Sequence, residues 1–144
     1  RLAGWRLTVV PKAVMYHHYN FNKGVRKFYS SEKNRLYLLL KNMEVKTLTL
    51  IFPALILVEL CQWLHAAINR WLLLKIKSYF ELIVRLPRIL RKRKKLKSLR
   101  KVPDKEIVHI YQGNLAVSGM SNPLLTQVLS PILNIYWSMI RHLI

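Results

Sequence analysis

Two adjacent histidines, His17 and His18, have the side chains in this sequence best suited to holding a transition metal. A neutral imidazole is a common metal ligand. Neighbouring side chains on extended backbone point to opposite sides, so only one of the two can face a given pocket. A shift of register by one residue would exchange them. The alternative for either is a histidine at a strand end that bonds to backbone or water.

Three further side chains could contact a substrate. Arg26 and Arg35 each carry a guanidinium, which pairs with phosphate in two-pronged fashion and could therefore hold a diphosphate. The alternative for Arg35 is a cap or salt link within its own helix, and for Arg26 it is simple solvation, which we favour. Trp5 could form a platform for a sugar ring, although packing in a core is the favoured interpretation.

Carboxylates are scarce. Asp104 is the sole aspartate, and the five glutamates lie far apart in the sequence, at Glu32, Glu44, Glu59, Glu81 and Glu106. A metal-assisted or acid–base reaction needs carboxylates placed together, and no pair here is set up to share a metal or a proton. We therefore do not expect this chain to catalyse a reaction by itself.

The composition combines a strong positive charge with a high apolar content. The formal net charge is +19, while 52% of the residues are hydrophobic. Basic soluble proteins rarely carry so much aliphatic and aromatic surface, so the combination favours an anionic membrane face over solution or nucleic acid. Cys61 is the single cysteine, which excludes an internal disulfide and fits a reducing cytosolic setting.

The elements that would position these residues begin with short strands. Side chains alternate from Trp5 to Val10, where Gly4 allows a tight entry and Pro11 ends the pairing, and Ala13 to Tyr16 forms a second extended piece. A polar loop over residues 20–28 should follow. A helix is expected to start at Ser30-Ser31-Glu32 and to stop at Asn42.

The middle of the chain is apolar and then amphipathic. Residues 47–58 and 60–69 carry no formal charge, with Glu59 between them and Pro53 placed to bend or break a helix. This stretch could span a membrane, but a re-entrant or interfacial helical pair fits at least as well. From Trp71 to Leu90 the apolar spacing predicts an amphipathic helix that ends or kinks near Pro87.

A basic run follows at residues 88–101, RILRKRKKLKSLRK. Its leucines and the flanking Trp71 favour a helix that lies on anionic lipid. A solvated linker is the alternative, and binding to nucleic acid is disfavoured because no nucleic-acid module accompanies the run. Pro103-Asp104 should break the helix, residues 112–123 should form a loop, and residues 124–144 a last apolar helix that is interfacial or a marginal span.

The first 42 residues resemble the end of the catalytic domain in family 2 glycosyltransferases of the rhamnosyltransferase-like kind. The matching residues, in order, are Gly4 and Trp5, Val10-Pro11, Ala13-Val14, Tyr16-His17, Asn34-Arg35 and Lys41-Asn42. The sequence departs from the family pattern at Lys33, where Arg or Glu is commoner, and at Lys12, where an acidic residue is frequent. Beyond residue 42 the resemblance is loose.

The resemblance implies an inverting transfer of sugar from a nucleotide-sugar donor to a glycan or lipid-linked acceptor. In that family a GT-A domain holds Mg or Mn with an Asp-x-Asp motif, and an aspartate before the Gly-Trp strand is the base. Neither is found in this sequence. The resemblance places His17 at the metal and diphosphate, while Arg26, Arg35 and Trp5 become candidate substrate-binding residues.

Together these observations predict a mainly α chain. A short amino-terminal strand remnant of a GT-A α/β domain (1–42) would precede amphipathic and basic membrane-associated helices (43–101), then a loop and a carboxy-terminal apolar helix (102–144). We expect the carboxy-terminal portion of a glycosyltransferase of polysaccharide or cell-envelope biosynthesis, at the cytoplasmic face of the cell membrane. The alternative is a non-enzymatic basic module that binds membranes.

Overall fold

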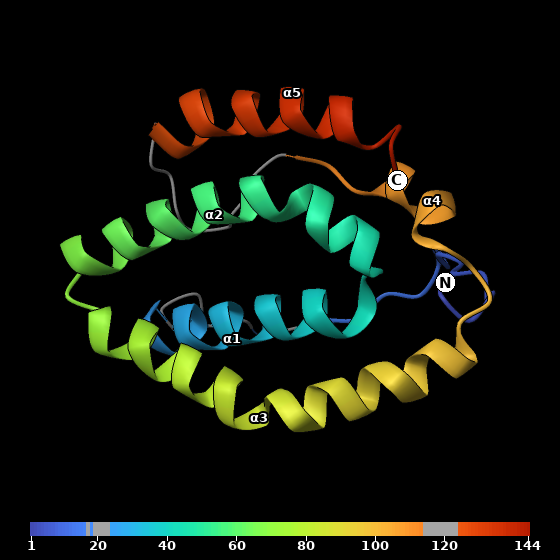
Figure 1. Ribbon diagram of the computed structural model, residues 1–144, viewed down its shortest axis with the longest axis horizontal. Coiled ribbons are helices and arrows are strands. Elements are labelled where there is room, and N and C mark those ends of the chain that lie inside the picture. The colour runs from blue at the N-terminus through green and yellow to red at the C-terminus, as the bar shows by residue number, and fades with distance from the viewer. Residues whose placement is uncertain (17, 19–23, 114–123) are drawn as a thin grey trace. The chain divides into compact units, whose positions relative to one another are not determined.

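The chain is mainly helical, as the sequence predicts. The computed structural model describes residues 1–16, 18, 24–113 and 124–144 (Figure 1). Its elements are α1 (Gly24–Asn42), α2 (Val45–Ile68), α3 (Leu72–Leu99), α4 (Asp104–Ile107), the 3-10 turn η1 (Val108–Ile110), the π-helical η2 (Leu124–Leu129) and α5 (Ser130–Ile140). No β-strand occurs within these described ranges.

The helices belong to two compact units that share α2. Unit 1 contains residues 1–42 and 62–101, and unit 2 contains residues 43–61 and 102–144. The boundary between them therefore falls within α2, after Cys61. The chain enters unit 2 after Asn42 and passes from unit 2 back into unit 1 within this one continuous helix.

In unit 1, α1 packs along α3 (Figure 1). The buried apolar side chains are few, with Ala66 of α2 and Ile89 of α3 fully enclosed. Phe28, His65 and Trp71 form an aromatic group in which the ring centroids of Phe28 and Trp71 lie 5.2 Å apart. These rings join the start of α1 to the turn between α2 and α3.

In unit 2, α5 packs on the first two thirds of α2. Val58, Leu129 and Leu133 form the buried cluster, with Ala54, Leu57 and Cys61 around it. The Tyr136 hydroxyl donates a 2.7 Å hydrogen bond to the Leu50 carbonyl, and the Trp137 indole N–H donates to the Tyr111 carbonyl at 3.1 Å. The Leu50 carbonyl lies in the turn before Pro53, where a proline disturbs the helical hydrogen bonds and leaves carbonyls able to accept others.

The turn after α2 is a Schellman motif built on arginine instead of glycine. The Trp71 N–H donates to the Ala66 carbonyl at 2.7 Å and the Arg70 N–H to the Ala67 carbonyl at 3.2 Å. Arg70 has φ 59°, the left-handed conformation that this motif requires. The His65 and Trp71 rings, 5.7 Å apart, supply the side-chain contact that accompanies such a turn.

The start of α2 is capped from a distant part of unit 2. Asp104, whose side chain is fully buried, accepts a 2.7 Å hydrogen bond at Oδ2 from the Glu44 N–H, immediately before Val45. A carboxylate there also faces the positive end of the helix dipole. The sole aspartate of the sequence therefore serves a helix terminus.

The structure corrects the predicted strands. Residues 5–10 and 13–16 have no regular secondary structure. A strand requires a hydrogen-bonded neighbour. The amino-terminal backbone instead forms two turns, in which the Gly4 N–H donates to the Arg1 carbonyl and the Ala13 N–H donates to the Val10 carbonyl, and the Leu2 carbonyl accepts from the Lys101 N–H. The tight turn at Gly4 is confirmed, with φ 84°.

One helix boundary also differs from the prediction, and two helices continue through a proline where an end or a bend was expected. α1 begins at Gly24 instead of Ser30, so residues 24–28 of the predicted loop are helical, although Asn42 ends the helix as expected. α2 continues through Pro53 and α3 continues through Pro87 to Leu99. Packing on neighbouring helices offsets the hydrogen bond that each proline removes. Pro103-Asp104 separates α3 from α4, as predicted. The predicted loop at 112–123 lies mostly outside the described residues.

Candidate functional site

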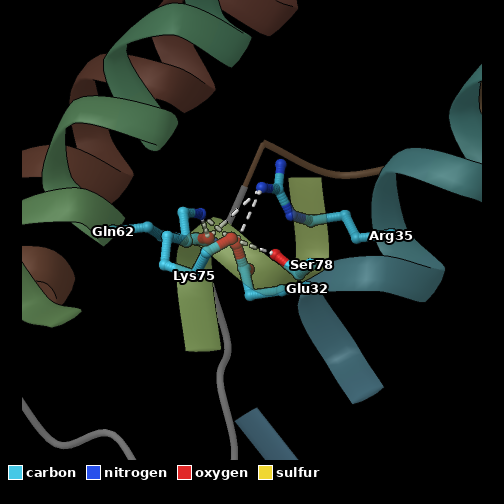
Figure 2. Close-up of polar contacts among 5 residues, drawn as sticks. All are labelled: Glu32, Arg35, Gln62, Lys75 and Ser78. Atoms are coloured by element: carbon cyan, nitrogen blue, oxygen red, sulfur yellow. Dashed lines mark hydrogen bonds and ion pairs between the residues drawn. The ribbon is translucent and has the colours of Figure 1, made fainter. Parts of the chain in front are cut away.

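Two polar residues in the first half of α3, Lys75 and Ser78, face inward. Lys75 is fully buried and its ammonium group pairs with the carboxylate of Glu32 on α1, which is 4% exposed. Lys75 Nζ also donates to Gln62 Oε1 at 3.0 Å. The Ser78 hydroxyl, equally buried, donates to the Lys75 carbonyl at 2.7 Å. Figure 2 shows these side chains converging from three helices of unit 1.

Arg35, a predicted phosphate-binding residue, belongs to the same network. Its Nη2 lies 3.5 Å from Glu32 Oε2 and donates to Gln62 Oε1 at 3.2 Å (Figure 2). Its side chain is 25% exposed. The Glu32 carboxylate thus faces two cations, Lys75 and Arg35, and the guanidinium forms the intrahelical salt link that the sequence offered as the alternative.

The apolar residues of α3 face outward. Leu73, Ile76, Phe80 and Ile83 are all exposed, with Phe80 at 66%. In a water-soluble helical protein the apolar stripe is buried and the polar face is solvated. Here the arrangement is inverted over the first half of the helix. Paired ionisable groups inside a helical group and apolar side chains outside are typical of proteins in contact with lipid.

The same outward apolar pattern runs along α2. The exposed residues Phe52, Ile56, Leu60, Leu64 and Ile68 recur every four positions. Among the described residues α2 is the one helix long and apolar enough to cross a membrane, by length and composition: it has 24 residues, a mean hydropathy of 1.8 and 11% of its most apolar window buried. A core helix of a soluble protein would instead be mostly buried.

The cations of the basic half of α3, together with Arg100 directly after it, divide into two sets of side chains. Arg93 and Arg100 turn toward α1, where Arg93 Nη1 donates to the Leu40 carbonyl and Arg100 Nη1 donates to the Asn42 carbonyl, at 3.0 Å for the latter. These cations satisfy the carbonyls of the last turn of α1 and oppose its dipole. The remaining cations are exposed; they are Arg88, Arg91, Lys92, Lys94, Lys95 and Lys97.

Part of the second set lines a groove between α1 and α3. A cavity of about 160 Å³ is bounded by Lys33, Asn34 and Tyr37 of α1 and by Leu82, Arg85, Arg88, Ile89 and Lys92 of α3. An open depression of about 470 Å³ adjoins it along α3 and is lined by Arg88, Arg91, Lys92 and Lys95. Arg88 and Lys92 border both. No acidic residue occurs in the sequence between Glu81 and Asp104, so these cations create a strongly positive surface.

Glu81 lies at the edge of this groove. The Tyr29 hydroxyl donates to its carboxylate, and Lys33 and Arg85 lie 3.5 and 3.3 Å from Glu81 Oε2. The hydrogen bond from Tyr29, together with Lys33 and Arg85, holds the pKa of Glu81 below its ordinary value. That same hydrogen bond raises the pKa of Tyr29. The single negative charge of Glu81 therefore offsets one of the two positive charges of Lys33 and Arg85, and Arg88 and Lys92 add two more positive charges to the groove.

The other predicted site residues are not brought together. His17, the predicted metal ligand, and the side chain of Arg26 lie outside what the structure describes. Trp5 is 79% exposed and packs in no core. Within the described residues no three His, Cys, Asp or Glu side chains gather into a possible metal site. The described donor side chains do not by themselves make up a Mg or Mn site, and we derive no chemistry from such a metal.

Sequence inspection missed Glu32, Gln62 and Lys75 as a group. The sequence does contain a pattern that relates to this group. Lys75 and Ser78 interrupt the apolar run of α3 at helical spacing, and they share one face of the helix with Leu82 and Ile89. Their partner Glu32 lies 43 positions away from Lys75. Helix periodicity alone identifies a face but does not say which face is buried.

Comparison with known proteins gives no relative: no protein-family model matches the chain, and neither the curated proteins nor the solved structures contain a significant match.

Proposed function

We propose that this chain is the membrane-associated carboxy-terminal part of a family 2 glycosyltransferase. In this proposal α2 and the first half of α3 contact lipid, and the basic half of α3 contacts anionic headgroups. The observation that carries the proposal is the inverted polarity of α3, with Lys75 inside and Phe80 outside. The enzymatic half of the proposal rests on the resemblance of residues 1–42.

The energetics favour membrane association. Each large apolar side chain that moves from water into lipid gains about 1.5–3 kcal/mol, and several such side chains are exposed on α2 and α3. Each Lys or Arg near an anionic leaflet adds about 1 kcal/mol before screening. Both contributions act on the same unit, because α3 carries exposed apolar residues in its first half and exposed cations in its second.

Vesicle flotation tests the membrane half. Replacement of Phe80 and Ile83 by serine should weaken binding to anionic vesicles at least tenfold, since two inserted side chains are lost. The matched control is Val9→Ser, which removes an exposed apolar side chain outside the helices. Salt should weaken the binding of both proteins, because it screens the basic half of α3. Equal binding by the double variant and the control would refute this placement.

The exposure of the first residues supports the enzymatic half. Trp5, Leu7 and Val9 alternate along the sequence and are all solvent-exposed. Alternating apolar residues of this kind would be covered if the segment joined a sheet. In the proposed enzyme that sheet belongs to a GT-A domain, which also supplies the metal-binding carboxylates and the base for transfer from a nucleotide sugar.

Two experiments test the enzymatic half of the proposal. Joined behind an intact nucleotide-sugar-binding domain, the chain should support metal-dependent transfer, and His17→Ala should reduce it, whereas the chain alone should be inactive. Unchanged activity and metal affinity would remove His17 from the site. The coding sequence upstream of Arg1 separates the enzyme from the non-enzymatic membrane module, because the enzyme requires an Asp-x-Asp motif there.

A further inference from the structure

We propose that the groove between α1 and α3 is a binding site for a phosphomonoester or diphosphate group. The cavity is bounded on one side by Lys33, Asn34 and Tyr37 and on the other by Arg85, Arg88 and Lys92. All of these residues belong to unit 1. This assignment differs from the predicted diphosphate contacts, because Arg35 lies in the Glu32 network instead.

The chemistry of the lining fits a phosphoryl group with more than one negative charge. Arg88 offers a two-pronged guanidinium, and Lys92 offers an ammonium group. Asn34 and Tyr37 carry neutral donors, and Leu82 with the fully buried Ile89 forms an apolar wall that weakens competition from water. Because Glu81 offsets one of the two charges of Lys33 and Arg85, Arg88 and Lys92 supply most of the attraction for the ligand.

Size narrows the ligand further. The cavity volume of about 160 Å³ is below the roughly 300–1,000 Å³ of sites that enclose whole small molecules. The cavity therefore suits the terminal phosphate group of a ligand instead of a whole nucleotide sugar. The adjoining depression lined by Arg91 and Lys95 could take a second phosphate. Lipid headgroups and free diphosphate both present this chemistry, and the lipid source alone depends on the proposed membrane association.

The test uses the whole chain in detergent micelles or on vesicles. The groove variant Arg88→Gln/Lys92→Gln is compared with Lys94→Gln/Lys97→Gln, which loses the same charge from the same helix but does not line the cavity. One arm titrates inorganic pyrophosphate into micelles. The other compares vesicles of phosphatidic acid, a phosphomonoester, with vesicles of phosphatidylglycerol, a phosphodiester, at equal surface charge. Tyr37→Phe, which removes one hydroxyl, provides a milder groove variant if the double variant loses helicity.

We expect the groove variant to lose at least tenfold in pyrophosphate affinity and to lose the preference for phosphatidic acid, while the control changes each less than threefold. Either loss confined to the groove variant supports the site, and the arm in which it appears identifies the source. Pyrophosphate binding without any vesicle binding would leave the site standing and refute the membrane proposal. The inference is wrong if neither arm separates the groove variant from the control. It is also wrong if RNA displaces bound pyrophosphate as well as free pyrophosphate does. In either case the basic surface attracts anions without a specific site.

Discussion

The carboxylate of Glu32 and the ammonium group of Lys75 form a buried ion pair between α1 and α3. Removal of Lys75 leaves the buried Glu32 carboxylate with Arg35 as its remaining charged partner among the described residues, and loss of one partner of a buried ion pair typically costs about 3–5 kcal/mol. Lys75→Met should therefore destabilise unit 1 by that amount, measured by chemical denaturation in micelles followed by helical circular dichroism.

The double variant Glu32→Leu/Lys75→Met is the control for this pair. It removes both charges, so it should be more stable than Lys75→Met, because no buried carboxylate is left with fewer cations. Additive losses in the double variant would show that the two groups do not interact in solution.

Acid should weaken the contact between Tyr29 and Glu81. The pKa of Glu81 is lowered from its ordinary 4.5, so its contribution is present above 4.5 and is lost as the pH falls through the folded-state value. The pKa of Tyr29 is raised from 10.0, so its contribution is present below 10.0 and is lost as the pH rises through its folded-state value. We expect the thermal unfolding midpoint to fall towards acid pH and towards alkaline pH. Both falls should be less steep in Tyr29→Phe than in the parent protein. Parallel profiles would exclude the contact.

Arg70→Gly should stabilise the turn between α2 and α3. A residue with a Cβ in the left-handed region costs roughly 1–2 kcal/mol, and glycine removes that cost at φ 59°. The gain should be about 0.5–1 kcal/mol, because glycine also loses more backbone entropy on folding. Arg70→Ala removes the same charge but keeps the Cβ, so it should show no gain in unfolding midpoint. Equal midpoints for the two variants would contradict the strain.

Asp104→Ala should destabilise unit 2 through the start of α2. Loss of the cap to the Glu44 N–H should cost about 1–2 kcal/mol. Glu106→Ala is the matched control, because Glu106 is an exposed acid on the same short helix. Amide hydrogens in the first turn of α2 should exchange faster in Asp104→Ala than in Glu106→Ala. If Asp104→Ala and Glu106→Ala exchange alike, the capping role is wrong.

The sequence predicted the helical class because the apolar spacing of residues 71–90 and the stops at Asn42 and Pro103 act locally. It failed for residues 5–16, since strand periodicity describes a segment whose partner must come from elsewhere. At Pro53 and Pro87 it left open whether each helix ends or bends; both helices continue, because tertiary packing outweighs one missing hydrogen bond. The Glu32–Lys75 pair depends on how α1 and α3 meet, which no local pattern specifies.

The most direct test of the central claim measures the surroundings of position 80 on vesicles. An environment-sensitive fluorophore is attached to Phe80→Cys in a Cys61→Ser background, with Lys97→Cys as the reference position at the basic end of α3. We predict a blue shift and quenching by lipid-borne quenchers at position 80, and a smaller effect at position 97. A fluorophore at position 80 that stays in water while the protein is bound to vesicles would contradict the account.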